Sequence, residues 1–493
     1  TRTAEGRISF RRLGGTRYSR TAFAGASTGQ QLLYALDEQV RRYESEGLVT
    51  KHEGWEFLSG VIDGNGVCNG ITAMSLRTLE VKAFAADAVI VATGGIGSIF
   101  GKSTNSMICT GSAQSALYQQ GALYANGEFI QVHPTTIPGD DKLRLMSESI
   151  RGEGGRVWVP RAEGDKREPK FIPEHERFYF LEERYPGYGN LVPRDIATRE
   201  IFKICLDGHG IGGGNMVYLD LTHIPPETLN SKLGSVLDIY QKFVGDDPRT
   251  TPMKIFPGMH YTMGGLWVDR DQMTNVEGLF AAGEGDFTIH GANRLGANSL
   301  ASCIYGGTVA GEASVRYAKY DVQGEANPGL YEREVLRQIE TNERIKKQRG
   351  PENAYVLHEE MGRLMTENLT VIRYNRRIEQ TDAKLIEMLD RFAGVDINET
   401  VYWASQALPH ARQLYNMLHL SRVIARGALQ RNESRGAHYK PNYPERDDDQ
   451  FLKTTIAAYT PEGPELSYRA VDLSLVQPRQ RVYDVTKQDA PAK

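Results

Sequence analysis

The chain has 493 residues, of which 40% are hydrophobic and 24% are charged, a composition typical of a globular protein of about three domains. Its 62 acidic and 58 basic residues give a formal net charge of -4, so the overall charge does not indicate a nucleic-acid partner. No run approaches the roughly 20 apolar residues of a membrane span, and no signal peptide opens the sequence. We therefore expect a soluble chain that binds any anion at a local site.

The cysteines of the chain lie far apart and form no CxxC motif. They are Cys68, Cys109, Cys205 and Cys303. Without paired spacing they predict neither a zinc ribbon nor an iron–sulfur cluster, and we expect no metal site. We predict scattered, buried thiols in a reducing compartment.

The first elements follow the order helix, meander and strand. Residues 27–47 carry apolar side chains at helical spacing, with Ser27 and Thr28 as candidate N-caps. Residues 49–84 are typical of short strands, interrupted by a DGNG turn. The apolar run 88–92 predicts a buried parallel strand, and the ATGG sequence that closes it lets backbone approach a ligand.

This order is typical of the later half of a dinucleotide-binding domain, whose first half carries a GxGxxG motif. The only match to that spacing is Gly208, Gly210 and Gly213. It follows a predicted helix and precedes a predicted strand, the reverse of the order that phosphate binding requires, so we interpret it as a loop. Either the protein binds no dinucleotide, or a βαβ unit precedes Thr1.

Polar residues then gather in the stretch GEFIQVHPTTIPGDDKLRLMSESIRGEGG. It contains His133, Ser147, Glu148, Arg151 and Glu153. Glu148 and Arg151, at positions i and i+3, would by themselves predict a salt bridge on a surface helix. The density of such groups between glycines favours a functional site instead.

Three further positions are weak signals when taken singly. Arg194 directly follows a proline, as residues that start helices often do, and His260 precedes a pair of glycines. Arg294 lies in HGANRLGANSL, which contains no acidic residue to pair with it. A lone arginine of this kind is usually a solvated surface residue, but the set as a whole indicates a binding site.

The ordered motifs HPT, SESIRGEGG, PRD, HYTMGG, AAGE and HGANRLGANSL resemble the flavoprotein subunits of succinate dehydrogenase and fumarate reductase. The resemblance extends to the late sequence ESRGAHYKPNYPERDDD and is strongest to the menaquinone-linked bacterial branch. In this family FAD is attached covalently to a histidine in an N-terminal segment, which here would precede Thr1. We therefore expect the native polypeptide to extend N-terminally by at least one βαβ unit, about 30 residues or more, carrying GxGxxG and that histidine.

The resemblance implies an α/β fold in which a Rossmann-like FAD-binding domain is interrupted by an α+β capping domain. A helical-bundle domain and a small C-terminal segment follow. The implied boundaries are 1–132 for the FAD-binding domain without its N-terminal βαβ unit, 133–258 for the capping domain, 259–325 for the returning part of the FAD-binding domain, 326–440 for the helical domain and 441–493 for the C-terminal segment.

The implied chemistry holds two carboxylates so that the bond between the methylene carbons lies against the flavin. The resemblance assigns one carboxylate to Arg294 and His260, and the other to His133 and Ser147. A guanidinium suits this task because its planar fork meets a carboxylate bidentately. Arg294 would then have no partner nearby in sequence because its partner is the substrate.

Arg194 resembles the proton-transfer residue of the family, and Glu148 and Arg151 resemble its relay. The remaining positions that the resemblance assigns match contacts to the flavin. They are Thr93, Gly94, Tyr261, Glu284, Ser299 and Leu300.

Two positions depart from the commoner family pattern. Leu13 stands where many relatives have phenylalanine in RxFGG, and Ser112 stands where others have the aspartate of TGDG. We expect a looser apolar wall over the substrate and an altered flavin contact, with no loss of a catalytic group.

The resemblance implies oxidation of succinate to fumarate, reversibly, with electrons passed through an iron–sulfur subunit to quinone. A cytochrome b membrane anchor would hold the complex peripherally on the cytoplasmic face of the cell membrane. An L-aspartate oxidase and an inactive assembly flavoprotein are the alternatives, and the sequence does not decide the physiological direction.

Overall fold

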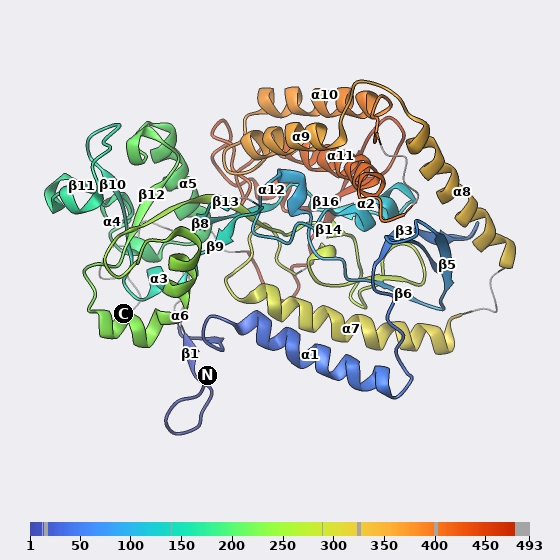
Figure 1. Ribbon diagram of the computed structural model, residues 1–493, viewed down its shortest axis with the longest axis horizontal. Helices are drawn as coiled ribbons and strands as arrows, with labels where there is room; N and C mark the ends of the chain where they lie inside the picture. Colours follow the sequence, from blue (N-terminus) through green and yellow to red (C-terminus); the bar gives the residue numbers. More distant parts are fainter. Residues whose placement is uncertain are drawn as a thin grey trace.

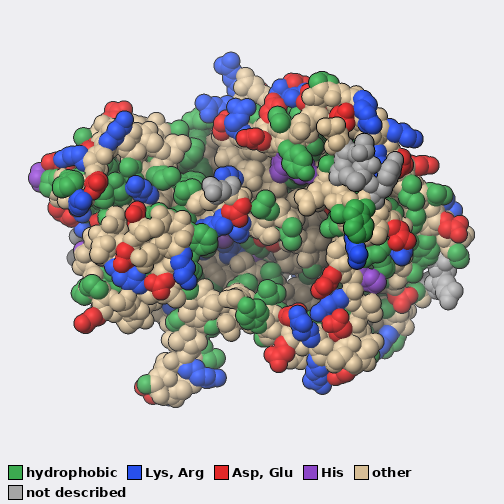
Figure 2. All heavy atoms as spheres, in the orientation of Figure 1, with side chains coloured by type: hydrophobic (Ala, Val, Ile, Leu, Met, Phe, Trp, Pro, Cys, Tyr) green, Lys and Arg blue, Asp and Glu red, His purple; other side chains and the backbone are tan. Residues whose placement is uncertain are grey.

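The structure is a computed structural model that describes residues 1–11, 13, 18–139, 141–287, 289–322, 327–398 and 403–478. Figure 1 shows a smaller lobe on the left and a larger lobe on the right. The two are joined by a long antiparallel pair, β8 (Ile130–Ile137) and β13 (Met253–Thr262). The space-filling view shows that the surface is hollowed between the lobes (Figure 2).

The larger lobe contains the elements predicted for the FAD-binding domain. The expected first helix is α1 (Thr28–Ser45), and the expected meander is the antiparallel sheet of β3 (Trp55–Ile62), β4 (Cys68–Ser75) and β5 (Val81–Ala85). The expected parallel strand is β6 (Val89–Val91), which pairs in parallel with β15 (Leu279–Ala281). The α/β prediction for this region is therefore confirmed.

Burial differs from the prediction at three places. Ile90, in the middle of β6, is 42% exposed. The cysteines are free thiols, as expected, but only Cys68 and Cys205 are buried. Cys109 is half-buried and Cys303 is exposed, so the prediction of buried thiols was wrong for these two residues. Cys303 lies on α7 (Asn298–Tyr320), near exposed Ile304 and Tyr305.

The smaller lobe is the predicted α+β capping domain. Its six-stranded sheet has the order β11-β10-β12-β13-β8-β9. Besides β8 and β13, the strands are β9 (Arg144–Leu145), β10 (Arg156–Pro160), β11 (Arg177–Phe178) and β12 (Val217–Asp220). The helices are α3 (Ser149–Gly152), α4 (Phe180–Arg184), α5 (Arg194–Leu206) and α6 (Pro226–Val244). The glycines at 208–213 lie in the connection between α5 and β12, so their interpretation as a loop is confirmed.

Four long helices follow, as predicted for the helical domain. They are α8 (Pro328–Lys347), α9 (Ala354–Leu369), α10 (Asn375–Phe392) and α11 (Ala407–Gln430). On α10, Ile378, Leu385 and Phe392 recur every seven residues and are all buried, as expected of a helix with one apolar stripe. Among the described residues, no helix is long and apolar enough to cross a membrane.

The C-terminal segment joins the larger lobe instead of standing apart. Its strands β16 (Lys453–Ala458) and β17 (Glu465–Ala470) extend a sheet with β7 (Tyr124–Ala125) and β14 (Gly265–Leu266). The side chain of Arg431, fully buried after α11, forms ion pairs of 2.7 Å with Glu128 and 2.8 Å with Glu433. The remaining β-strands and α-helices are β1 (Phe10–Arg11), β2 (Thr21–Ala22), α2 (Ser112–Gln119) and α12 (Asp448–Phe451).

Candidate active site

The predicted substrate and proton-transfer residues come together where the two lobes meet. His133 lies on β8 and His260 on the adjacent β13, and their ring centroids are 5.1 Å apart. Arg194 is the first residue of α5. Pro193, whose ring fixes the backbone, is the N-cap residue directly before it. Glu148 is the N-cap residue of α3, and Arg151 is the third residue of that helix.

Arg194, Glu148 and Arg151 form one continuous ion-paired chain. Arg194 Nε lies 2.8 Å from Glu148 Oε1, and Arg194 Nη2 donates to Glu148 Oε2 at 3.1 Å. Arg151 Nη2 donates to the same carboxylate at 3.3 Å. The Glu148 and Arg151 side chains are each 1% exposed, so the surface salt bridge considered from the sequence is instead buried.

The charges of these groups depend on one another. Burial raises the pKa of Glu148, but the positive charges of Arg194, Arg151 and Arg294 outweigh burial and leave it below its usual value. Burial lowers the pKa of Arg151, in part offset by the neighbouring Glu148 carboxylate. Glu148 is therefore held as a carboxylate between two guanidinium groups, the arrangement in which a proton can move between neighbours.

Arg294 has no ion-pair partner among the described residues, although only 3% of it is exposed. Its guanidinium lies 4.5 Å from the centre of the Tyr261 ring, a cation–π contact. Its Nε is buried without a hydrogen-bond partner. Burial and the charge of Arg194 lower the pKa of Arg294 to about 10, so it stays charged at neutral pH.

Both histidines are neutral at physiological pH. Burial, with the positive charges of Arg194 and Arg294, holds the pKa of His133 and of His260 well below the ordinary value. The backbone N–H of Thr135 donates to His133 Nδ1 at 3.2 Å, which requires that His133 carries its proton on Nε2. That Nε2 is buried and has no partner in the described part of the chain.

Ser147 lies at the edge of this cluster, and its hydroxyl is already engaged. Its Oγ is 2.7 Å from Ser149 Oγ and accepts a hydrogen bond from the Ser149 backbone at 3.2 Å. One lone pair or the hydroxyl proton remains for a ligand. Ser147 can therefore make one further hydrogen bond to a ligand.

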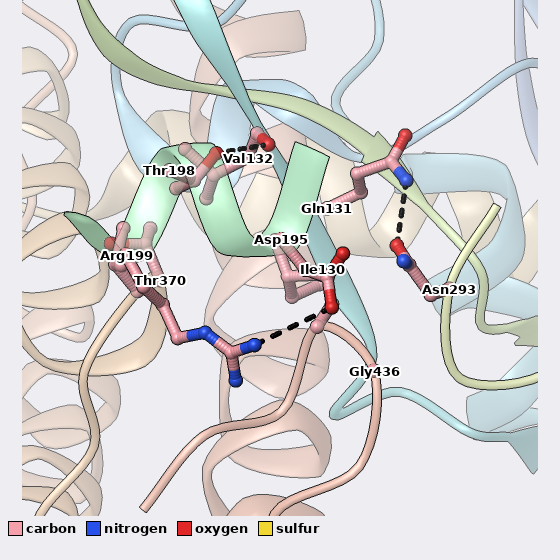
Figure 3. A pocket seen from close by; sticks show the side chains of 11 residues that line it. Ile130, Gln131, Val132, Asp195, Thr198, Arg199, Asn293, Thr370 and Gly436 are labelled. Carbon is pink, nitrogen blue, oxygen red and sulfur yellow. Dashed lines mark hydrogen bonds and ion pairs between the residues drawn. The ribbon is translucent and has the colours of Figure 1, made fainter. Parts of the chain in front are cut away.

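Gln131 is a residue of the site that the motifs did not predict. Its Oε1 accepts from Arg194 Nη1 at 3.2 Å, while its Nε2 donates to Asn293 Oδ1 at 2.9 Å and to the Arg294 carbonyl at 2.8 Å. Figure 3 shows the Gln131 side chain directed toward Asn293. Strand alternation places Gln131 on the same face as His133, which was the available signal.

Two of the predicted flavin contacts lie in the turns that follow the parallel strands β6 and β15. Gly94 follows β6 with a φ of +73°, and Glu284 follows β15. A Cβ on Gly95 would lie 2.4 Å from Glu284 Oε1, so this approach requires glycine. An α/β sheet binds a dinucleotide at the carboxyl ends of its parallel strands, where turns with small side chains let the backbone approach the ligand. These turns therefore suit the flavin half of FAD.

The other predicted contacts lie around the same turns. Thr93 is exposed beside Gly94, Ser299 and Leu300 lie in the first turn of α7, and Leu300 is 38% exposed. Burial raises the pKa of Glu284 to about 7, against the opposing effect of hydrogen bonds from Thr262. Glu284 thus carries only part of a negative charge at neutral pH.

The two departures from the family pattern have local explanations. Leu13 is 7% exposed, and a Cβ placed on Gly296 would lie 3.1 Å from its Cδ1. It therefore packs against the Arg294 loop, although residues 12 and 14–17 around it lie outside the described residues. Ser112 Oγ accepts from Asn416 Nδ2 of α11 at 2.7 Å, a contact that a serine hydroxyl can make.

A large cavity lies elsewhere, between the capping lobe and the helices. Its volume is about 570 Å³, and its lining includes Phe100, Phe202, Phe256 and Val371. The predicted substrate-binding side chains do not line it. A cavity of about 20 Å³, with room for a water molecule, is lined by Gln131, Asn293 and Asp195, among other residues (Figure 3).

The site has a charge that suits a small dianion. Three buried guanidinium groups and the Glu148 carboxylate leave about two positive charges when both histidines are neutral. The Nε of Arg294 and the Nε2 of His133 have no hydrogen-bond partner among the described residues. Fold and site together define a flavin-dependent oxidoreductase with a capping domain, acting on an anion.

Comparison with known proteins agrees with this class. The family described as FAD binding domain matches residues 1–300, and the family described as Fumarate reductase flavoprotein C-term matches residues 358–483. The succinate dehydrogenase flavoprotein subunit of Bacillus subtilis is 58% identical over 99% of this chain and 82% of its own length. The fumarate reductase flavoprotein subunit of Escherichia coli is 32% identical over 98% of this chain and 79% of its own length.

A solved structure of the E. coli quinol fumarate reductase superposes with a TM-score of 0.88 at 31% identity, covering 98% of this chain and 82% of that one. The chain belongs to the family of flavoprotein subunits of succinate dehydrogenase and fumarate reductase. It is accordingly an FAD-dependent oxidoreductase, and the predicted family and fold class are confirmed.

Proposed function

We propose that this chain oxidises succinate to fumarate and catalyses the reverse reaction. The observation that carries the proposal is the buried cluster with about two positive charges, in which Arg294 has no carboxylate partner among the described residues. Succinate supplies two negative charges on a short chain. Its charge therefore matches the cluster, and a neutral or singly charged substrate would leave a guanidinium buried and unpaired.

Arg294 and His260 bind one carboxylate, and His133 and Ser147 bind the other. Arg294 presents its fork, and the two neutral histidines donate from Nε2. Gln131 positions the arginines, because one amide contacts both Arg194 and the backbone of Arg294. Two fixed carboxylates leave the central carbon–carbon bond in a single orientation.

Arg194 holds and moves the proton. In the oxidation direction Arg194 first gives up a proton, which Glu148 and Arg151 pass toward solvent. The neutral Arg194 side chain then accepts the proton that leaves a methylene carbon of succinate. Glu148 compensates the charge of Arg194 at 2.8 Å, while Arg151 disfavours a second positive charge nearby. FAD, when bound, supplies the hydride acceptor, and in fumarate reduction both transfers reverse.

We further propose the contacts that the family resemblance implies. Thr93, Gly94, Tyr261, Glu284, Ser299 and Leu300 face the flavin, and FAD is attached through a histidine outside residues 1–493. Electrons leave through an iron–sulfur subunit toward menaquinone, and a cytochrome b anchor holds the complex on the cytoplasmic face of the membrane. Mass analysis of the denatured chain for retained flavin tests the covalent bond.

The function is tested on the purified complex by measuring succinate oxidation with an artificial electron acceptor and fumarate reduction with a reduced donor. We expect both activities, and competitive inhibition by malonate. L-aspartate oxidation with oxygen as acceptor, in place of succinate oxidation, would overturn the proposal. Flavin binding without either activity would do the same, in favour of an assembly protein.

A further inference from the structure

The side chain of Thr104 contacts the ring of His260. Its Oγ1 lies 2.6 Å from His260 Nδ1, although the two residues are 156 positions apart in the chain. Its backbone N–H donates to the Met259 carbonyl at 3.0 Å, immediately before the histidine. Thr104 is therefore fixed to β13 at two neighbouring points.

The direction of this hydrogen bond decides what His260 can bind. A neutral imidazole carries its proton on one nitrogen and accepts at the other. If the threonine hydroxyl donates to Nδ1, the proton lies on Nε2, which can then donate to a carboxylate. If Nδ1 carries the proton, Nε2 presents a lone pair that repels a carboxylate.

His133 and His260 differ in how this choice is made. For His133 a backbone N–H donates to Nδ1, and a backbone N–H has no alternative direction. For His260 the partner is a hydroxyl, which can donate or accept. The hydrogen bond to His260 Nδ1 therefore depends on how Thr104 is positioned beside the ring.

The capping domain supplies a contact that holds Thr104. Lys142 Nζ, from the segment before β9, donates to the Thr104 carbonyl at 3.1 Å and to the Asn105 carbonyl at 3.2 Å. The backbone of Leu143 donates to the Ser103 carbonyl at 3.0 Å. The residues on both sides of Thr104 are thus tied to the capping domain.

We propose that Thr104 is a positioning residue that fixes His260 in the tautomer able to donate to a substrate carboxylate, and that Lys142 of the capping domain holds Thr104 in place. The inference rests on the proposed function. It makes the binding geometry of His260 depend on the contact between the two lobes. The capping domain thereby contributes to substrate binding through a residue of the other lobe.

The test compares Thr104→Val with Thr104→Ser in the assembled complex, using malonate and the flavin absorbance change as the binding probe. Valine keeps the shape and removes the hydroxyl, so we expect the Kd of malonate and the KM of succinate to rise about tenfold, with a smaller change in kcat. Thr104→Ser keeps the hydroxyl, so the Kd of malonate and the KM of succinate should stay close to those of the unmodified complex. Thr381→Val, which removes a buried hydroxyl from α10, is the control for general loss of stability.

Lys142→Met gives a second measurement that leaves the side chains of the site unchanged. Lys102 provides the matched control, because its Nζ bridges the same two segments through the Gly139 carbonyl at 3.0 Å without contacting Thr104. We expect Lys142→Met to weaken malonate binding more than Lys102→Met. Equal effects would overturn the role of Lys142.

The remaining outcomes separate this inference from the proposed function. If the unmodified complex shows no absorbance change with malonate and no succinate oxidation, the proposed function fails. If it shows both and Thr104→Val binds malonate normally, the inference about Thr104 fails. Loss of binding in Thr104→Val that serine does not restore would also overturn it, since the hydroxyl would then not be the cause.

Discussion

Arg294 and Arg194 carry the same side chain in different surroundings, and this difference separates their expected roles. Arg294 stacks on Tyr261 and has no carboxylate partner among the described residues. Arg194 shares the Glu148 carboxylate and the Gln131 amide. An unpaired guanidinium is suited to bind an anion, whereas a paired one next to a relay is suited to move a proton.

We expect Arg294→Lys to weaken binding of dicarboxylates by about 1–3 kcal/mol, because lysine keeps the charge but loses the bidentate fork. Titration of flavin absorbance with malonate measures the change. Arg270→Lys, at a residue whose side chain is 92% exposed, is the control and should bind normally. Unchanged malonate affinity in Arg294→Lys would exclude Arg294 from carboxylate binding.

We expect Arg194→Gln to reduce kcat by about a hundredfold or more and to leave malonate binding largely intact, because only the transition state uses the proton transfer. Steady-state rates and malonate titrations on the same preparation measure the two effects. Near-normal turnover would remove Arg194 from the mechanism, together with the relay through Glu148 and Arg151.

The lowered pKa values of His133 and His260 predict how binding depends on pH. Both histidines stay neutral from pH 8 to about 6.5, so malonate affinity should not rise with acidification across this range once the ionisation of malonate is corrected for. The free energy of unfolding changes with pH in the opposite direction to that expected for a histidine whose charged form is stabilised by folding. Acidification below about 6.5 protonates these histidines in the unfolded chain first, so it lowers the free energy of unfolding.

Malonate titrations at several pH values measure this dependence. A tenfold rise in affinity for each pH unit of acidification near pH 6.5 would show that a protonated histidine binds the ligand. That result would contradict the neutral donor geometry assigned to both rings.

At the scale of elements, the turn after α11 supports the loop that carries Arg294. The backbone of Ala437 donates to the Ala292 carbonyl at 2.9 Å. Gly436 has a φ of +56°, and a Cβ there would lie 2.4 Å from the same carbonyl. The ESRGAHY sequence therefore acts on the site through packing, although it contributes no predicted substrate-binding residue.

We expect Gly436→Ala to lower the free energy of unfolding by about 1–3 kcal/mol and to weaken malonate binding, because the added methyl displaces Ala292. Thermal unfolding and malonate titration measure the two effects. Gly234→Ala, in α6, is the matched control, since its Cβ would meet no atom within 4 Å. Normal malonate binding in Gly436→Ala would show that the turn does not position Arg294.

At the scale of the whole molecule, the distribution of cysteines bears on how electrons leave the site. The four thiols are dispersed, and no group of three or more histidine, cysteine, aspartate or glutamate residues in the described part of the chain could hold a metal ion. An iron–sulfur cluster needs several cysteine ligands close together. We therefore expect electrons to reach quinone through a separate iron–sulfur partner.

We expect the chain alone to oxidise succinate with a small artificial acceptor but to reduce quinone only after an iron–sulfur partner is added. Parallel assays with and without the partner measure this difference. Full quinone reductase activity from this polypeptide alone would contradict the prediction.

The motifs were sufficient to predict the family, the order of elements and most of the candidate site. Periodicity predicted α1, the meander and the helices after Pro328 because it reflects which face of an element is apolar. The glycine-rich turns and the spacing of HPT, PRD and HGANR carried the resemblance. Such features are local, so they can be recognised in the sequence without the packing around them.

Only the tertiary structure decided which groups meet and how they are charged. Thr104 and His260 lie 156 positions apart, and no local pattern joins them. The resemblance implied that Glu148, Arg151 and Arg194 act together, but the spacing of Glu148 and Arg151 predicted a pair on the surface, whereas both side chains are buried. Charge states depend on burial and on neighbours brought from distant segments, so the sequence determined which chemical groups are present, and packing determined their partners.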